Sequence, residues 1–450
     1  MKNTDMIEMT PEVQTAGVVI PSLFERPIFG PARIEETEGL VEALGVKLGF
    51  SDAIRVRKPN ASKLFGAGQL DIIADKLEDN EASLLIVDSV LSPIQQRNLE
   101  KHLNVKVMDR TGLILEIFGV RARSAEGRLQ VEMARQLYER SRLVRTWTHL
   151  ERQRGGTGFL AGPGESQLEA DRRMLDLRIA KLKSDLEAVR RTRRLQRAGR
   201  KRRGAPIVAL AGYTNAGKST LFNRLTNATV FAADMPFATL DPTARDVELS
   251  SGKKISLIDT VGFITDLPTH LIESFRATIE EAIEADLLLH VRDISHPETD
   301  RQAWDVEDVL RQLEKETETE RPPVLEVWNK ADALSEDVRG VMEATAQNRD
   351  DVVMTSATSG QGVDTLLAVI QEKIFSTSRE FEMKLEPRMG KARAWLHTHC
   401  EIVSENVDES GNIILVAQMS ARELSHFAHE HEDINVDEII LSSRNIDFES

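Results

Sequence analysis

The stretch that decides the fold is Gly212-Tyr-Thr-Asn-Ala-Gly-Lys-Ser219. It follows the apolar run Ile207–Ala211 and precedes the helix-like Thr220–Leu225, so it is predicted to lie at a turn from strand to helix. Glycines let such a turn curl with its N–H groups pointing inward, as in a phosphate-binding loop. In that loop the Lys218 ammonium would reach the β and γ phosphates and the Ser219 hydroxyl would ligate Mg²⁺. The stretch therefore predicts a nucleotide site on an α/β domain.

Three further segments follow in a fixed order and identify the base. Asp259-Thr-Val-Gly262 ends an apolar strand, where a carboxylate can hold a metal-bound water and the last N–H can contact a γ-phosphate. Asn329-Lys-Ala-Asp332 ends another, and its carboxylate can accept from guanine N1–H and the exocyclic amine together. Ser356-Ala-Thr358 completes the set. Because adenine lacks that donor pair, the order predicts a guanine-nucleotide switch.

The residue after Gly262 is Phe263, where many GTPases of the Ras type have a glutamine that orients the attacking water. A phenyl ring cannot do this, so we expect slow intrinsic hydrolysis, with the missing positioning supplied by the switch backbone, a partner or a bound cation. Asn215 resembles the phosphate-loop asparagines that ligate K⁺ in cation-activated GTPases, which makes K⁺ one candidate cofactor beside Mg²⁺. The alternative is an asparagine that stabilises the loop by bonding to its own backbone.

Between the first two motifs lies the segment Pro236–Arg245, which contains two threonines able to complete the Mg²⁺ shell in the triphosphate state. Spacing alone does not choose between Thr239 and Thr243. Either could also be a turn hydroxyl.

Composition limits the remaining possibilities. A length of 450 residues with 41% hydrophobic content suggests about three domains with ordinary cores. The first 20 residues lack a basic start followed by an apolar run, and no stretch approaches the ~18 apolar residues of a membrane span. The single cysteine, Cys400, excludes an internal disulfide and suits a reducing compartment. We therefore expect a cytoplasmic protein without a transmembrane segment.

The net charge is −15, but the two signs are unevenly distributed. Residues 188–203 contain nine Arg or Lys and no acid, whereas residues 401–450 contain twelve Asp or Glu against two Arg. If nucleic acid is a partner, it would meet the middle of the chain. The alternative for the basic run is a solvated helix end followed by a flexible linker.

Two apolar stripes flank the glycine-rich segment Gly155–Gly164. Over residues 126–154 and again over 166–196, apolar residues recur at steps of three, four and seven, which predicts two long helices that pair. The segment between them cannot be helical, so we expect an antiparallel hairpin with a glycine-rich tip. Polar and stacking groups there, such as Arg154 and Phe159, suit single-stranded or looped RNA, and a plain turn between helices is the alternative.

The segment Gly155–Arg173, the phosphate loop extended to Asn223 and the run Phe237-Ala-Thr-Leu-Asp241 together closely resemble the HflX family of translational GTPases. Val107–Phe118 and Gln130–Ala134 resemble its amino-terminal region, so the resemblance covers nearly the full chain. It implies a GTPase that binds the 50S subunit and its 23S rRNA and dissociates stalled or idle 70S ribosomes, with the hairpin toward the peptidyl-transferase region. The alternative is a nucleotide-gated RNA-binding or RNA-remodelling module in ribosome biogenesis. We expect no DNA partner, and a monomer when off the ribosome.

The resemblance also selects Thr239 over Thr243 as the Mg²⁺ ligand beside Ser219, and implies catalytic roles for Lys218, Thr239 and Gly262. The expected GTP contacts are Gly212, Tyr213, Thr214, Asn215, Ala216, Gly217, Lys218, Ser219, Phe237, Ala238, Thr239, Leu240, Asp241, Asp259, Thr260, Val261, Gly262, Asn329, Lys330, Ala331, Asp332, Ser356, Ala357 and Thr358. The expected contacts with RNA or the ribosome are Arg154, Gly155, Gly156, Phe159, Arg190, Arg191, Arg193 and Arg194.

The expected fold class is α/β with several domains. Residues 1–125 alternate strands and helices, which favours a small parallel sheet, with the first helix near 34–49. Residues 126–204 would form the hairpin and its basic linker, residues 205–375 the GTPase domain with its phosphate loop, and residues 376–450 a small α+β domain.

Overall fold

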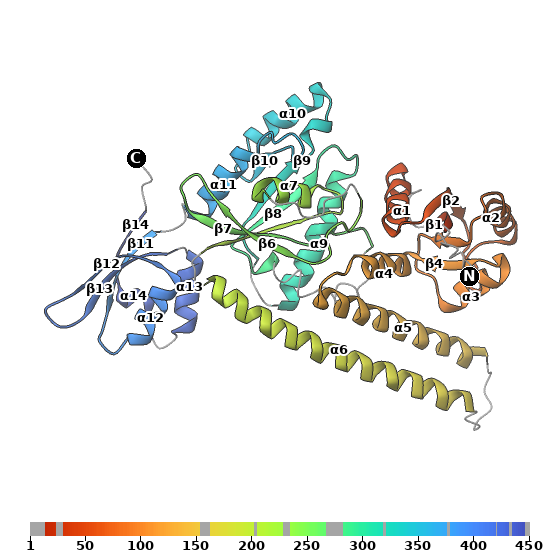
Figure 1. The fold of residues 1–450 in the computed structure, drawn as a ribbon, viewed down its shortest axis with the longest axis horizontal. Coiled ribbons are helices and arrows are strands. Elements are labelled where there is room, and N and C mark those ends of the chain that lie inside the picture. The colour runs from red at the N-terminus through yellow and green to blue at the C-terminus, as the bar shows by residue number, and fades with distance from the viewer. Residues whose placement is uncertain are drawn as a thin grey trace, which may run out of the picture.

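The computed structural model describes residues 14–23, 30–153, 163–201, 205–227, 235–266, 282–317, 321–375, 379–419, 421–431 and 434–445. Three β-sheets follow one another along the chain, and two long helices lie between the first and the second (Figure 1). The expected multidomain α/β fold class is confirmed.

The first sheet has the strand order β2-β1-β3-β4 and is parallel throughout, as predicted. Its strands are β1 (Thr15–Leu23), β2 (Lys47–Val56), β3 (Leu84–Val87) and β4 (Lys106–Asp109), with helices α1 (Pro31–Leu44), α2 (Ala67–Asp79), α3 (Pro93–Leu103) and α4 (Arg110–Arg121). The expectation that the first helix extends to residue 49 is wrong. Gly45 ends α1 in the left-handed conformation, with φ +79°, and the chain then enters β2.

The two long helices are α5 (Ala125–Gln153) and α6 (Pro163–Lys201), and they run antiparallel side by side (Figure 1). Met133, Leu137, Ile179 and Leu186 are buried between them, with Leu129 and Leu182 partly buried. Because these residues belong to the two apolar stripes, the predicted pairing of the helices is confirmed. The glycine-rich tip, residues 154–162, lies outside the described residues.

The second sheet has the order β10-β9-β8-β5-β7-β6, and all its neighbouring pairs are parallel except β6 with β7. Its strands are β5 (Ile207–Gly212), β6 (Thr243–Glu248), β7 (Lys254–Asp259), β8 (Leu287–Asp293), β9 (Val324–Asn329) and β10 (Val352–Met354). The flanking helices are α7 (Lys218–Thr226), α9 (Thr299–Thr317), α10 (Glu336–Gln347) and α11 (Val363–Phe375), and a 3₁₀ turn, η1, covers Ala331–Ala333. The carboxyl ends of parallel strands meet at one edge, which is where such sheets bind ligands.

The third sheet is antiparallel, in the order β12-β13-β11-β14. It contains β11 (Arg379–Leu385), β12 (Glu401–Val407), β13 (Ile413–Met419) and β14 (Ile440–Asn445), with helices α12 (Gly390–His399), α13 (Ala421–Glu430) and α14 (Val436–Ile439). Trp395 and Phe427 pack edge to face in its separate core. Among the described residues, no helix is both long and apolar enough to cross a membrane.

The first and second sheets share one apolar core. Val18 and Ile20 of β1, Ala209 of β5, and the ring pair Phe118 and Phe237 all belong to the same buried cluster. Burial of apolar area is the main favourable term in packing two such units. The region before α5 is therefore an integral part of the body that carries the second sheet.

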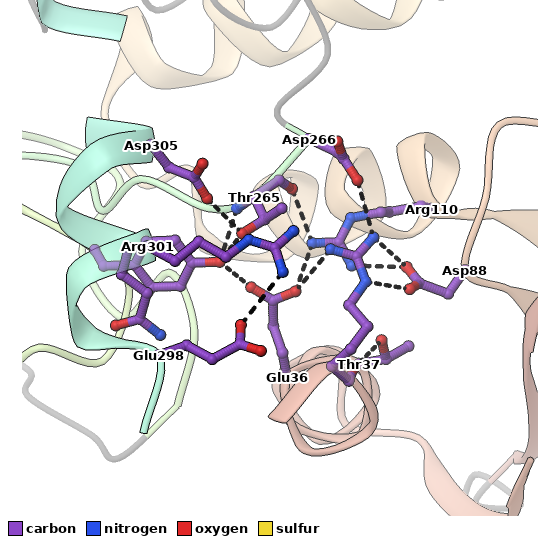
Figure 2. Close-up of polar contacts among 12 residues, drawn as sticks. Glu36, Thr37, Asp88, Arg110, Thr265, Asp266, Glu298, Arg301 and Asp305 are labelled. Atoms are coloured by element: carbon purple, nitrogen blue, oxygen red, sulfur yellow. Dashed lines mark hydrogen bonds and ion pairs between the residues drawn. The ribbon is translucent and has the colours of Figure 1, made fainter. Parts of the chain in front are cut away.

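A buried ionic cluster lies at the same junction (Figure 2). The Asp88 carboxylate is fully buried and accepts from Arg33 Nε at 2.6 Å and from Arg110 Nη1 at 2.7 Å. Glu36 accepts from Arg110 Nη2 at 2.9 Å and from the Tyr213 hydroxyl. Burial alone would raise the pKa of Asp88, but Arg110 and Arg33 hold it below its usual value. The Asp88 carboxylate therefore depends on these two arginines to remain ionised in the interior.

The cluster also binds the loop that follows the Asp259–Gly262 motif, through a hydrogen bond and an ion pair (Figure 2). Arg110 Nη2 donates to the Thr265 carbonyl at 3.0 Å, and Arg33 Nη2 lies 3.3 Å from Asp266. The Thr265 N–H donates to the Tyr213 hydroxyl at 2.7 Å, and its own hydroxyl donates to Asp305 at 2.7 Å. Helices α1 and α4 of the first region thus contact the edge of the second sheet where its ligand site is expected.

Replacing Asp88 by alanine should destabilise the chain by about 3–5 kcal/mol, because two buried guanidinium groups would lose their shared partner. Since the pKa of Asp88 is lowered in the folded chain, its contribution is complete above the ordinary value of about 3.9 and is lost as pH falls through the folded value. Urea unfolding of the variant and of the unchanged protein measures this difference in the free energy of unfolding. The exposed Asp75→Ala on α2 is the control, and equal midpoints for the two variants would contradict the assignment.

Candidate nucleotide-binding site

A cavity of about 370 Å³ opens at the carboxyl edge of the second sheet. Its walls are Thr214, Asn215, Gly217, Lys218, Ser219, Thr220, Met235, Phe237, Ala238, Thr239, Thr260, Gly262, Asn329, Lys330, Asp332, Ala333, Ala357 and Thr358. All four sequence motifs meet there. Thr220, Met235 and Ala333 also line it, although no sequence signal distinguished them from their neighbours.

Nine residues expected to contact GTP do not line this cavity: Gly212, Tyr213, Ala216, Leu240, Asp241, Asp259, Val261, Ala331 and Ser356. Asp259 is one of them, but it bonds to Ser219 and Thr239, which do line the cavity. Leu240 is 2% exposed and belongs to the shared apolar core, and Asp241 bonds to the start of α5. These two therefore contact other parts of the protein in this structure.

The phosphate loop joins β5 to α7 and is tied to the end of β9 through Asn329. The Asn329 Nδ2 donates to the Ala216 carbonyl at 2.8 Å, and its Oδ1 accepts from the Ala357 N–H at 2.9 Å. Gly217 has φ +88°, and an added Cβ would lie 2.2 Å from Asn329 Nδ2. Glycine is required here by both the backbone conformation and the close approach. One amide thus links the phosphate loop to the loop expected at the base.

Lys218 is buried at the start of α7, with its Nζ donating to the carbonyls of Gly212 at 3.1 Å and Tyr213 at 2.8 Å. Burial lowers its pKa to about 8, although the nearby Asp259 acts in the opposite direction. Burial likewise raises the pKa of Asp259, against the effect of Lys218. Both charges are therefore short of the solvation or partners that their ionised forms need. Phosphate oxygens near Lys218 and a cation near Asp259 would supply them.

The side chains at Asp259 form a set of oxygen donors suited to a hard cation. Asp259 Oδ2 accepts from Ser219 Oγ at 2.7 Å and from Thr239 Oγ1 at 2.9 Å, and the two hydroxyl oxygens are 2.6 Å apart. Asp259 Oδ1 is buried and makes no hydrogen bond with the described residues. Mg²⁺ binds oxygen ligands of this kind, including one or two carboxylates and waters. The residues present therefore fit a magnesium site.

Thr239 and Thr243, between which spacing alone could not choose a Mg²⁺ ligand, lie in different places in the structure. Thr239 lies in the oxygen set just described and is 9% exposed. Thr243 instead begins β6 and pairs with Asp259 through the antiparallel ladder. Only Thr239 lines the cavity, which agrees with the role that the resemblance implied for it.

The base end of the cavity contains Asp332 in η1 together with Lys330, Ala357 and Thr358. An arginine that sequence reasoning missed supports it from outside. Arg224, in the last turn of α7, donates to the carbonyls of Ala357 at 3.2 Å and Thr358 at 2.6 Å. Its contacts could not be read from the sequence, because 133 and 134 residues separate Arg224 from Ala357 and Thr358.

Phe263 is 4% exposed and its ring packs in the shared core, so it cannot face an attacking water. Its backbone pairs with the phosphate loop, through Phe263 N–H to Gly212 O at 3.1 Å and Thr214 N–H to Phe263 O at 2.7 Å. A Cβ on Gly262 would lie 2.9 Å from Thr214 and 3.0 Å from Lys218 Nζ. The switch backbone therefore lies directly against the residues expected at the γ-phosphate.

Asn215 is exposed, lines the cavity and has φ +61°, a conformation that asparagine tolerates better than most residues. With the described part of the chain its amide makes no hydrogen bond, so the expected alternative of a bond to its own backbone is not seen. The backbone conformation alone gives a structural reason for asparagine. Because Asn215 lines the cavity, K⁺ ligation by its side chain stays a prediction.

The expected RNA contacts are only partly placed. Arg154, Gly155, Gly156 and Phe159 lie outside the described residues. Arg190, Arg193 and Arg194 lie on α6, and of the four arginines expected there, the structure describes only the side chain of Arg191, which is exposed. These contacts remain predictions.

Comparisons with known proteins match most of the chain in four consecutive parts. Family models described as GTP-binding GTPase N-terminal, GTP-binding GTPase Middle Region, 50S ribosome-binding GTPase and HflX C-terminal domain match residues 31–119, 121–200, 207–330 and 341–432. A solved structure, "crystal structure of SsGBP and GDP complex", is 25% identical with a TM-score of 0.47, covering 80% of this chain and 98% of that chain.

Two curated relatives are more similar in sequence. GTPase HflX of Magnetococcus marinus is 46% identical over 85% of this chain and 87% of the relative. GTPase HflX of Escherichia coli is 41% identical over 86% of this chain and 89% of the relative. With this identity across most of both chains, and with the four GTPase motifs gathered at one cavity, the chain belongs to the HflX family and is a GTP-hydrolysing enzyme.

Proposed function

We propose that this GTPase binds the 50S subunit and its 23S rRNA through the α5–α6 hairpin and dissociates stalled or idle 70S ribosomes under the control of GTP. The observation that carries the proposal is that the hairpin is joined to two elements that carry nucleotide-site motifs. Asp241 contacts the residues before α5, and residues 202–206 alone separate α6 from β5, the strand that leads into the phosphate loop. A change at the nucleotide can therefore reach both helices of the hairpin.

Two further features support a ribosomal partner. The model matched by residues 207–330 describes a 50S ribosome-binding GTPase. The basic run at the end of α6 also offers charge for contact with the phosphate backbone of RNA. A module that only binds or remodels RNA under nucleotide control would use the same charge, and the hairpin experiment below distinguishes the two. We place the domain divisions near residues 125, 204 and 375, which fall between the three sheets and the hairpin.

At the phosphate end, we propose that Ser219 and Thr239 ligate Mg²⁺ and that Asp259 holds one of its waters. The ion would neutralise charge on the β and γ phosphate oxygens. Lys218 would turn from the carbonyls of Gly212 and Tyr213 to the phosphates, and the Gly262 N–H would contact the γ-phosphate. Since Phe263 is buried in the core, the attacking water would be oriented by backbone groups, a cation or the ribosome.

At the base end, we propose that the Asp332 carboxylate accepts from guanine N1–H and the exocyclic amine. Asn329 holds the neighbouring loop through Ala357, and Arg224 holds it from the other side. Specificity would then come from a carboxylate left unpaired by adenine. No DNA partner is proposed, and the protein off the ribosome is proposed to be a cytoplasmic monomer.

Asp332→Asn should exchange guanine for xanthine specificity, because the new amide offers a donor where guanine also offers one. We expect GTP to bind very roughly 10⁴-fold less well relative to XTP than in the unchanged protein. Competition of both nucleotides against a fluorescent GDP analogue measures this. Asp337→Asn, an exposed change on α10, is the control. An unaltered preference for GTP over XTP would show that Asp332 does not read the base.

GTP hydrolysis in KCl should be faster than in NaCl at equal ionic strength, and Asn215→Ala should abolish the difference, if K⁺ supplies positioning that Phe263 cannot. Initial rates in the two salts give the answer. Equal rates in both would make Asn215 a residue required only by the loop conformation.

Deleting residues 155–164 and joining the helices by a short turn should leave GTP hydrolysis by the isolated protein intact, because the helix contacts and the cavity lie elsewhere. The variant should lose the separation of 70S ribosomes into subunits, measured on sucrose gradients with GTP and with a nonhydrolysable analogue. Residual binding should weaken with salt, as contacts between Arg or Lys and phosphates do. Full separation of subunits by the variant would refute a role for the tip, and RNA binding by the unchanged protein without any separation would favour the alternative module.

A further inference from the structure

Asp241 lies two residues after Thr239 but contacts a different part of the protein. Thr239 bonds to Ser219 and Asp259 at the nucleotide site, whereas Asp241 bonds to the segment that begins α5. Between them, Leu240 is 2% exposed in the shared core. Consecutive residues of one short segment are thus fixed to the site, to the core and to the hairpin.

The Asp241 carboxylate binds the amino-terminal end of α5 through both of its oxygens. Oδ2 accepts from the N–H groups of Arg123 at 3.0 Å and Ser124 at 2.8 Å, and Oδ1 accepts from the Ser124 hydroxyl. The Ser124 oxygen in turn accepts from the Gly127 N–H at 2.8 Å. The first N–H groups of a helix have no partners within it, and a negative charge is favourable there. Asp241 therefore extends the cap that Ser124 makes for α5.

Two more contacts hold the same segment along its length. The ring of Phe237 packs edge to face on Phe118 of α4, with centroids 4.6 Å apart. Met235 Sδ lies 2.6 Å from Arg121 Nη2. Segment 235–241 is therefore attached to α4 and to the start of α5 at several points on both sides of Thr239.

We propose that Asp241 is a positioning residue for GTP hydrolysis: its bonds to Arg123 and Ser124 fix the segment that holds the Thr239 hydroxyl beside Ser219 and Asp259. The inference rests on the proposed role of Thr239 as a Mg²⁺ ligand. Asp241 acts through Thr239, because it does not line the nucleotide cavity. Without its bonds, the hydroxyl would be free to leave the oxygen set, and Mg²⁺ would lose a ligand in the triphosphate state.

Gly127 offers a way to break this contact without weakening the helix. A Cβ added there would lie 2.3 Å from Asp241 Oδ1, closer than any real contact, so the carboxylate would have to move. Alanine is also a better helix former than glycine, so Gly127→Ala should favour α5 itself. The variant therefore separates displacement of Asp241 from general loss of helix.

The experiment compares Asp241→Asn, Ser124→Ala and Gly127→Ala with Thr239→Ala as the positive control and exposed Asp246→Asn as the matched control. GTP turnover is measured across a Mg²⁺ titration, and the affinity for a fluorescent GDP analogue is measured in parallel. We expect the first three variants to lower kcat by roughly 10- to 100-fold and to need more Mg²⁺, as small displacements of a positioned group do. GDP affinity should change by no more than about 2-fold, and the double variant of Asp241 and Ser124 should be no worse than the single Asp241 variant.

The outcomes distinguish the ligand role of Thr239 from the positioning role of Asp241. If Thr239→Ala hydrolyses GTP normally, the proposed ligand role of Thr239 is wrong. If Thr239→Ala loses turnover while the Asp241, Ser124 and Gly127 variants match Asp246→Asn, the positioning role is overturned and the ligand role survives. Equal losses of turnover and GDP affinity would also overturn it, because they would show damage to the whole site.

Discussion

The site depends on a pair of buried opposite charges, Lys218 and Asp259, that neither the protein interior nor water fully satisfies. Burial shifts the pKa of both toward the neutral forms, downward for the lysine and upward for the aspartate. An uncompensated buried charge is costly, so each group gains when a ligand of opposite sign arrives. A triphosphate for one and a divalent cation for the other would remove both penalties together. The fold therefore holds two charges that a bound nucleotide and its cation would stabilise. Because the nucleotide binds the folded chain, its binding in turn stabilises the fold.

The second sheet is also bonded to the region that precedes it in the chain. Arg110 of the ionic cluster donates to the carbonyl of Thr265, and the start of α5 donates to Asp241. Both loops whose conformations depend on the γ-phosphate in GTPases are therefore bonded to elements outside the GTPase sheet. If a change in those outer elements altered the affinity for nucleotide, linkage would require the nucleotide to bias the outer elements by the same factor.

The sequence predicted the features that are local or periodic. The four motifs could be found because each lies at the end of a strand, and the hairpin because its stripe residues, such as Leu137 and Ile179, recur at helical spacing. The end of α1 was misplaced because a helix-like pattern continues past Gly45, whose left-handed conformation breaks it. Long-range pairs could not be predicted: nothing in the sequence joins Asp88 to Arg33, or Arg224 to Thr358. For the same reason Asp241 was expected at the nucleotide, although in the fold its carboxylate bonds to a helix start 117 residues earlier.

The length of α6 has a mechanical consequence. Its 39 residues correspond to about 59 Å of helix at about 1.5 Å per residue, and in the chain its carboxyl end directly precedes the segment that leads into β5 and the phosphate loop. A rigid arm of that length turns a tilt of about 5° at its base into a sweep of roughly 5 Å at its far end. The stiffness needed for this comes from α5, which packs against it through the buried leucine, isoleucine and methionine side chains. Movements too small to rearrange the nucleotide cavity can therefore be amplified geometrically into displacements the size of a side chain at a distant surface.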